Sequence, residues 1–238
     1  MSLGATKQLR SMSNLEAAVR SDKRIRVIIG HYGSGKTEFC VNYAMQLAEL
    51  PNTKVALADL DVVNPYFRSR ERHVMMEEKG ILVISSLMGN NINFELPSVD
   101  GAVLTPLQND SYDVILDVGG DSVGARPLAR FKEYLIEGDY DMLAVVNANR
   151  PDTQTEDGII MHVKAIEATV GAKVTGLINN THLLRDTTPE DVLGPQGMIE
   201  AAGKRMGLTV RYIAAIRGIA KQVSEMTEVP VVPIDMYM

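Results

Sequence analysis

Seven short apolar runs, separated by stretches of helical spacing, constrain the fold of this 238-residue chain more than any other feature. Each run is apolar nearly throughout instead of alternating with polar residues, which is typical of strands covered on both faces of a parallel sheet. The runs lie at 24–30, 54–60, 80–86, 112–118, 141–147, 173–179 and 209–216. This rhythm predicts an α/β fold with a doubly wound, mostly parallel sheet of about seven strands.

Local signals predict several element boundaries. An apolar stripe at helical spacing from Cys40 to Leu47 predicts a helix that ends near Pro51. Thr188, followed by Pro189 and by Asp191 three residues on, is typical of a capped helix start. The final ten residues, "VPVVPIDMYM", contain two prolines, so we expect at best an edge strand there.

The loop after the first run carries the most specific motif. "GHYGSGKT" matches G-x-x-x-x-G-K-[ST] between a predicted strand and a predicted helix. Glycines let the backbone wrap around phosphates, and the start of a helix adds a positive dipole end. Lys36 is placed to reach the β- and γ-phosphates, and the Thr37 hydroxyl suits Mg²⁺. The predicted nucleotide-binding residues here are Gly30, Gly33, Ser34, Gly35, Lys36, Thr37 and Glu38.

Acidic residues end two further strands. Asp117 closes an apolar run as a Walker B acid does, which indicates a metal anchor. Asp59 and Asp61 stand two residues apart, so both side chains can project to the same side. We expect one of the pair at the metal's water shell and the other at the attacking water, although a pair of solvated turn acids is the alternative. The predicted metal-binding residues are Thr37, Asp59 and Asp117.

With these motifs the sequence resembles the MinD/ParA-like P-loop ATPases, a group that includes CobQ/CobB-type domains. "GHYGSGKTE", "ADLDVVNP", "ILDVGGD" and, more weakly, "GLINNT" carry the resemblance, which extends from Arg26 to about Ile216. It implies a SIMIBI-class fold, binding of ATP and Mg²⁺, slow hydrolysis and often a nucleotide-dependent homodimer. It also implies that Asp61 holds the hydrolytic water and that Asn179 or Asn180 contacts the base.

The sequence departs from that family at His31. The family has a signature lysine at this loop position, which reaches the partner's phosphate across a dimer. Histidine is shorter and titrates near neutrality, so it replaces the lysine poorly and weakens the case for a homodimer. Arginines such as Arg126 and Arg150 could supply positive charge instead, but for any single one a solvated surface arginine is the simpler interpretation.

Composition limits location and partners. The net charge of −6 and pI of about 5.3 disfavour nonspecific binding to nucleic acid or to an anionic membrane. A single cysteine, Cys40, excludes an internal disulfide, and no run is long enough to cross a bilayer. We therefore expect a cytoplasmic protein, with residues 1–22 as a tail and residues 23–238 as a single nucleotide-binding domain.

Together these features predict an ATP hydrolase that acts as a nucleotide switch, with Lys36 and Asp61 as its catalytic residues and a partner protein or cargo still to be identified. Two alternatives share the same loop. One is a small-molecule kinase or an amide-forming synthetase, which would need a second pocket that excludes water. The other is a non-catalytic module in which bound ATP orders a surface for a partner. Hydrolysis of ATP without an added acceptor separates the first alternative from the switch.

Overall fold

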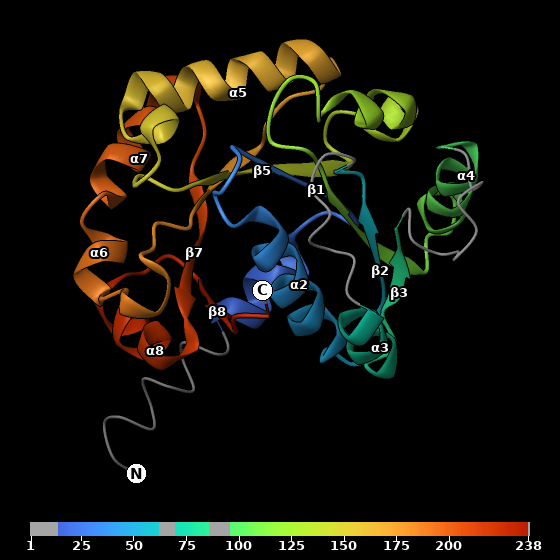
Figure 1. Cartoon of the computed structure of the whole chain (residues 1–238), viewed down its shortest axis with the longest axis horizontal. Coiled ribbons are helices and arrows are strands. Elements are labelled where there is room, and N and C mark those ends of the chain that lie inside the picture. The colour runs from blue at the N-terminus through green and yellow to red at the C-terminus, as the bar shows by residue number, and fades with distance from the viewer. Residues whose placement is uncertain (1–13, 62–69, 86–95, 238) are drawn as a thin grey trace.

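The computed structural model describes residues 14–61, 70–85 and 96–237, without the side chains of residues 70, 71 and 96–100. Eight parallel strands form one sheet in the order β3-β2-β4-β1-β5-β6-β7-β8 (Figure 1). The strands are β1 (Ile25–Gly30), β2 (Lys54–Asp59), β3 (Leu82–Ile84), β4 (Tyr112–Asp117), β5 (Tyr140–Val146), β6 (Gly176–Asn179), β7 (Val210–Ile216) and β8 (Val231–Ile234).

The doubly wound fold and all seven predicted strands are confirmed, and the sheet has one strand more than the seven expected. That strand, β8, lies at the sheet edge in the last ten residues, where its proline is tolerated because one side of an edge strand needs no ladder partner. β1 lies at the centre of the sheet, and its six residues are buried because helices cover both faces.

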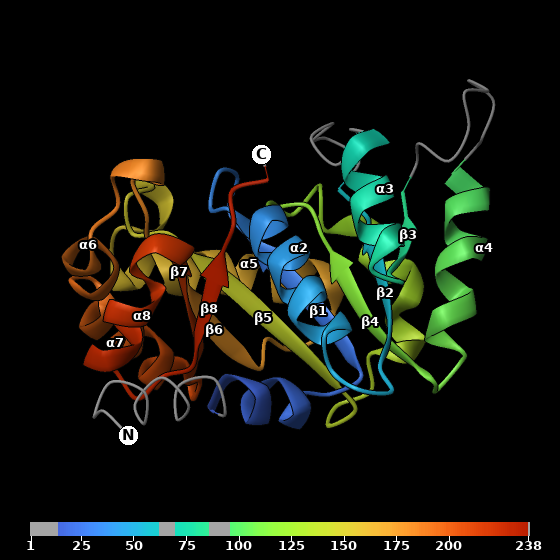
Figure 2. The same cartoon turned by 90° about the horizontal axis from the view of Figure 1, so that it is seen from below.

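Helices cover both faces of the sheet, and a separate apolar cluster lies between the helices and the sheet on each face. On one face α2 (Lys36–Ala48) and α3 (Arg70–Glu78) pack on the sheet, and on the other lie α4 (Leu96–Leu107), α5 (Glu156–Val170) and α7 (Gln196–Met206) with the 3₁₀ helix Arg126–Tyr134. A smaller cluster joins α6 (Pro189–Leu193) and α8 (Arg217–Met226) to β7 and β8. Figure 2 shows α2 and α3 side by side in front of the sheet.

The helix boundaries follow the local signals. α2 ends three residues before Pro51, and the Thr188 hydroxyl caps α6 while the Asp191 carboxylate accepts from the backbone N–H of Thr188. Both predictions are confirmed. No helix in the described part of the chain has the length and apolarity needed to cross a membrane.

The expected tail over residues 1–22 is wrong in its last part. Residues 14–21 form a helix, and its Leu15 and Val19 side chains are buried in the cluster beneath α2. The carboxylate of Asp22 then accepts hydrogen bonds from the hydroxyls of Tyr43 and Tyr212. The sequence of this segment has no strong helical periodicity, and these contacts hold the segment in place. Residues 1–13 lie outside the described residues.

Candidate functional site

The glycine-rich loop lies at the carboxyl end of β1, between β4 and β5. Gly33 and Gly35 have positive φ angles of 71° and 81°, a conformation that residues with a β-carbon rarely adopt. A β-carbon on Gly35 would also lie 2.4 Å from Nδ2 of Asn180. The loop therefore requires glycine at both positions, and α2 begins directly after it at Lys36.

Lys36 forms a buried ion pair. Its Nζ lies 2.7 Å from Oδ2 of Asp61, and the two side chains are only 5% and 7% exposed. Burial lowers the pKa of Lys36, but the charges of Asp117 and Asp61 outweigh it and the net pKa is raised. The predicted phosphate-binding lysine therefore remains protonated and is paired with Asp61.

The other two predicted acids face each other on neighbouring strands. Asp59 and Asp117 are the last residues of β2 and β4, and the register of the sheet pairs them directly. Burial raises the pKa of Asp59 to about 8, with a further contribution from the charge of Asp117. Burial raises the pKa of Asp117 to about 6, although Lys36 lowers it. Three carboxyl groups thus surround one lysine, and the raised pKa values of Asp59 and Asp117 show that the site is short of positive charge.

This deficit fits a divalent cation. Asp117 is fully buried, and neither of its carboxylate oxygens receives a well-directed hydrogen bond, although the Thr37 hydroxyl lies close enough to lower its pKa. Unsatisfied buried carboxylate oxygens are costly unless a ligand meets them. Within the described ranges no group of three or more His, Cys, Asp or Glu side chains is arranged to hold a metal ion. The oxygen donors present, Thr37 and Asp117, suit Mg²⁺, which keeps several waters and binds through few carboxylates together with phosphate oxygens.

A cavity of about 510 Å³ opens beside the loop. Its walls come from the loop, the start of α2, the turns after β5 and β6, and the ends of β7 and β8. The lining residues are Tyr32, Gly33, Gly35, Lys36, Thr37, Glu38, Arg150, Asn180, Thr181, His182, Leu184, Thr187, Val192, Ala214, Ala215, Ile216, Ile234 and Met236. It combines a cationic, glycine-rich end with a mostly apolar end, as a nucleotide requires.

The two candidate base-contacting asparagines have different surroundings. Asn180 lines this cavity, and its Nδ2 donates to the carbonyl oxygen of Ser34 at 2.7 Å. The Asn179 amide instead donates to Val192 O and to Gln196 Oε1, and its Oδ1 accepts from the backbone N–H two residues on. Asn180 is therefore placed to brace the loop and border a ligand, while Asn179 fastens β6 to α6 and α7.

The C-terminal segment at residues 234–237 forms one wall of the cavity. The sequence pattern did not predict this wall. Ile234 and Met236 line it, and Glu38 in the first turn of α2 accepts a hydrogen bond from the backbone N–H of Tyr237. Asn42 also exchanges two hydrogen bonds with the backbone of Asp235. These contacts fasten the C-terminal segment to the helix that follows the loop. Only the apolar character of the final run hinted at burial.

Gly120, in the segment after β4, packs against the glycine-rich loop. A β-carbon there would lie 2.4 Å from the carbonyl oxygen of Gly30, so its glycine allows the segment after β4 to pack on the phosphate loop itself. His31, at the family's lysine position, pairs with Asp152 at 3.2 Å and lies edge-on to the ring of His162. In this structure His31 is engaged within its own chain.

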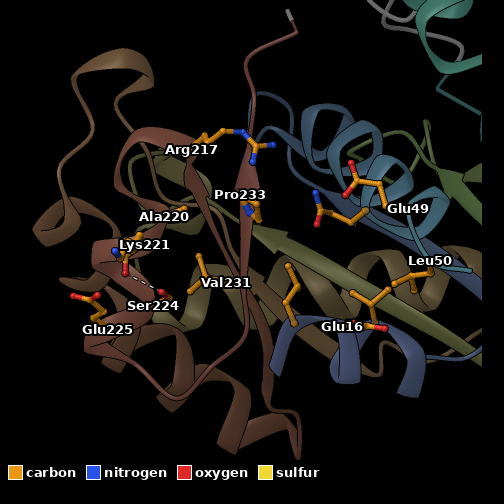
Figure 3. Close-up of a pocket in the computed structure, with 13 residues that line it drawn as sticks. Glu16, Glu49, Leu50, Arg217, Ala220, Lys221, Ser224, Glu225, Val231 and Pro233 are labelled. Carbon is orange, nitrogen blue, oxygen red and sulfur yellow. Dashed lines mark hydrogen bonds between the residues drawn. The ribbon is translucent and has the colours of Figure 1, made fainter. Parts of the chain in front are cut away.

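A second cavity of about 500 Å³ lies at the opposite end of α2, beside β8 (Figure 3). Residues 14–21, α2, α8 and β8 line it, and its rim carries acids and bases: Glu16, Glu49, Glu225, Arg217 and Lys221. The carboxyl end of a helix has a partial negative charge and repels anions. The cavity at the amino end of α2, which also contains Lys36, is therefore the better site for a phosphorylated ligand.

No protein-family model and no curated protein sequence matches the chain. Solved structures of the signal recognition particle receptor FtsY are similar in fold. The receptor from Elizabethkingia anophelis has a TM-score of 0.52 and 19% identity, over 89% of this chain and 66% of that one. The cell division protein FtsY from Thermotoga maritima has a TM-score of 0.54 and 20% identity, over 84% of this chain and 68% of that one.

The Elizabethkingia anophelis receptor in complex with GDP gives a TM-score of 0.50 and 19% identity, over 85% of this chain and 64% of that one. The chain thus spans about two thirds of the length of these receptors. At such identities the likeness shows the fold alone, a parallel sheet with helices on both faces. It does not single out the MinD/ParA-like group.

Proposed function

We propose that this protein binds ATP with Mg²⁺ and hydrolyses it as a nucleotide switch. The observation that carries the proposal is the Asp117 carboxylate, which is fully buried without a well-directed hydrogen bond beside Thr37 and the loop lysine. A structural acid at the end of β4 would gain partners within the protein. An acid that binds a metal–nucleotide complex instead finds partners for its oxygens in that complex.

The described residues of the site have separate roles in this proposal. The loop amides and Lys36 would hold the phosphates, and Thr37, Asp117 and Asp59 would hold the metal directly or through water. When bound, Mg²⁺ neutralises charge on the phosphate oxygens. Lys36 leaves Asp61 for the phosphates, and the freed Asp61 carboxylate accepts a hydrogen bond from the attacking water. Positioning suffices here because phosphoryl transfer has a loose transition state.

We propose adenine as the base, because the cavity offers little to recognise guanine. Guanine presents two neighbouring donors, N1–H and the N2 amino group, which an ionised carboxylate accepts well. Among the cavity's lining residues the one carboxylate belongs to Glu38, and it already accepts from the backbone of Tyr237. The remaining lining at that end is neutral, which suits a base that carries both a donor and an acceptor on one edge.

The second candidate is a GTPase, which the GDP complex of a structural neighbour favours. Competition between ATP and GTP for the Mg²⁺-loaded protein decides between them. Tighter binding of ATP supports the proposal, and tighter binding of GTP replaces it with the second candidate. Turnover should then be measured without an added acceptor, because release of inorganic phosphate distinguishes a hydrolase from a kinase or synthetase.

A nucleotide switch also needs something that responds to it. We propose a partner protein or cargo that distinguishes the ATP-bound from the nucleotide-free form. A homodimer is the alternative, and His31 argues against the family's way of forming one because it is held by Asp152. Measuring the molecular mass in solution with and without a non-hydrolysable ATP analogue tests the homodimer directly.

A further inference from the structure

We infer that Arg150 is a second phosphate-binding cation of the nucleotide site, an inference that rests on the proposed function. Arg150 follows β5, the strand beside β1, and its side chain lines the 510 Å³ cavity together with Lys36. Its Nε donates to the carbonyl oxygen of Gly33 at 2.8 Å. The guanidinium thus lies directly on the loop whose amides are to wrap the phosphates.

The contact between the guanidinium and Gly33 is close. A β-carbon on Gly33 would lie 3.0 Å from both Cζ and Nη2 of Arg150. Glycine at this position therefore leaves space for the guanidinium and also permits the positive φ. With Nε occupied by the Gly33 carbonyl, the hydrogens of the two terminal nitrogens remain for a ligand. Two parallel donors of this kind match two oxygens of a phosphate group.

Arg150 forms no ion pair with any residue in the described ranges, whereas the other cation of the cavity, Lys36, is paired with Asp61. His182, which also lines the cavity, has its pKa lowered by burial and then by the positive charge of Arg150. A polyphosphate in the cavity would give Arg150 an ion-pair partner.

The backbone around Arg150 is fixed in place. The backbone carbonyl oxygen of Asn147 accepts hydrogen bonds from the N–H of Arg150 and from the Thr153 hydroxyl. The side-chain Oδ1 of Asn147 accepts one from the backbone N–H of Asn149. The turn is also joined to the segment after β6, where Thr181 accepts from a backbone N–H of the turn. The Arg150 side chain itself is exposed to solvent, and its Nε bond to the Gly33 carbonyl is what directs it to the loop. A fixed backbone and this one bond reduce the conformational entropy that the side chain loses on binding a ligand.

The experiment compares affinities for ATP, ADP and adenosine in the wild-type protein and in Arg150→Gln, with Mg²⁺ present. Loss of a charge-assisted contact should weaken ATP and ADP binding by about 10- to 100-fold and leave adenosine affinity unchanged. Arg150→Lys should recover part of the loss, because a point charge remains. Arg205→Gln is the matched control, since this arginine pairs with Glu156 and Asp157 away from the cavity.

The outcomes separate the inference from the function on which it rests. Unchanged ATP affinity in Arg150→Gln, with normal wild-type binding, overturns the inference and leaves the proposed function intact. Equal losses for ATP and adenosine also overturn it, because Arg150 would then shape the cavity without contacting phosphate. If the wild-type protein binds none of these ligands and no GTP, the proposed function fails and the inference fails with it.

Discussion

Replacing Asp61 by alanine should tighten ATP binding while slowing turnover. The Asp61 carboxylate lies 2.7 Å from Nζ of Lys36, a contact between two nearly buried side chains. Nucleotide has to displace that carboxylate before the lysine can reach a phosphate. Alanine removes the competitor, and it also removes the group that we assign to the attacking water.

The magnitude follows from the ion pair. At 2.7 Å and an effective dielectric constant of about 20, Coulomb attraction amounts to about 6 kcal/mol, and lost hydration of the two buried ions offsets much of it. The net value of such a charge-assisted hydrogen bond is about 1.5–3 kcal/mol. Because Asp117 still attracts Lys36 in the variant, the lower figure applies, and ATP affinity should rise by about tenfold. Loss of a positioned proton acceptor should slow hydrolysis by about 100-fold.

Titration calorimetry with a non-hydrolysable ATP analogue measures the affinity, and phosphate release under single-turnover conditions measures the rate. Asp110→Ala is the control, because that carboxylate is 97% exposed and lies outside the cavity lining. Wild-type affinity and rate in Asp61→Ala would refute the reasoning. Weaker binding would mean that Asp61 holds the nucleotide complex more than it restrains the lysine.

Four further predictions concern other parts of the molecule. Lys36→Ala should reduce ATP affinity about 100-fold or more with an unchanged circular dichroism spectrum, and unchanged affinity would refute the phosphate-loop assignment. Asp117→Asn should weaken binding of ATP with Mg²⁺ more than binding of ATP with EDTA; equal losses would argue against a metal role. Burial lowers the pKa of His162 from 6.5 to about 4, so the unfolding free energy should fall by up to about 3 kcal/mol as pH drops through that window, and His162→Gln should show a smaller fall in urea titrations. Asp22→Ala leaves two buried tyrosine hydroxyls without their acceptor and should lower the urea-unfolding free energy by about 2–4 kcal/mol; a loss below about 0.5 kcal/mol would show that the helix at residues 14–21 is not fastened there.

Local patterns predicted much of the fold, and the physical reason differs from element to element. The seven runs from β1 to β7 were recognisable because a strand covered on both faces must be apolar along its whole length. The helix at residues 14–21 was missed because only two of its residues, Leu15 and Val19, are buried hydrophobics, too few to form a periodic stripe. β8 was recognised only as a possible edge strand, since Pro233 interrupts its pattern.

Residue types and spacings alone predict a phosphate loop with its lysine and threonine, and acids at two strand ends, because wrapping a backbone around phosphates and binding a metal require them. How these residues are engaged depends on the packing of the whole chain. It pairs Lys36 with Asp61, places Asp59 opposite Asp117 through the register of β2 and β4, and turns Asn179 away from the cavity. It also brings Arg150 onto the loop from 117 residues away in the chain. Such contacts depend on strand order and on packing across the sheet, which no local window of sequence contains.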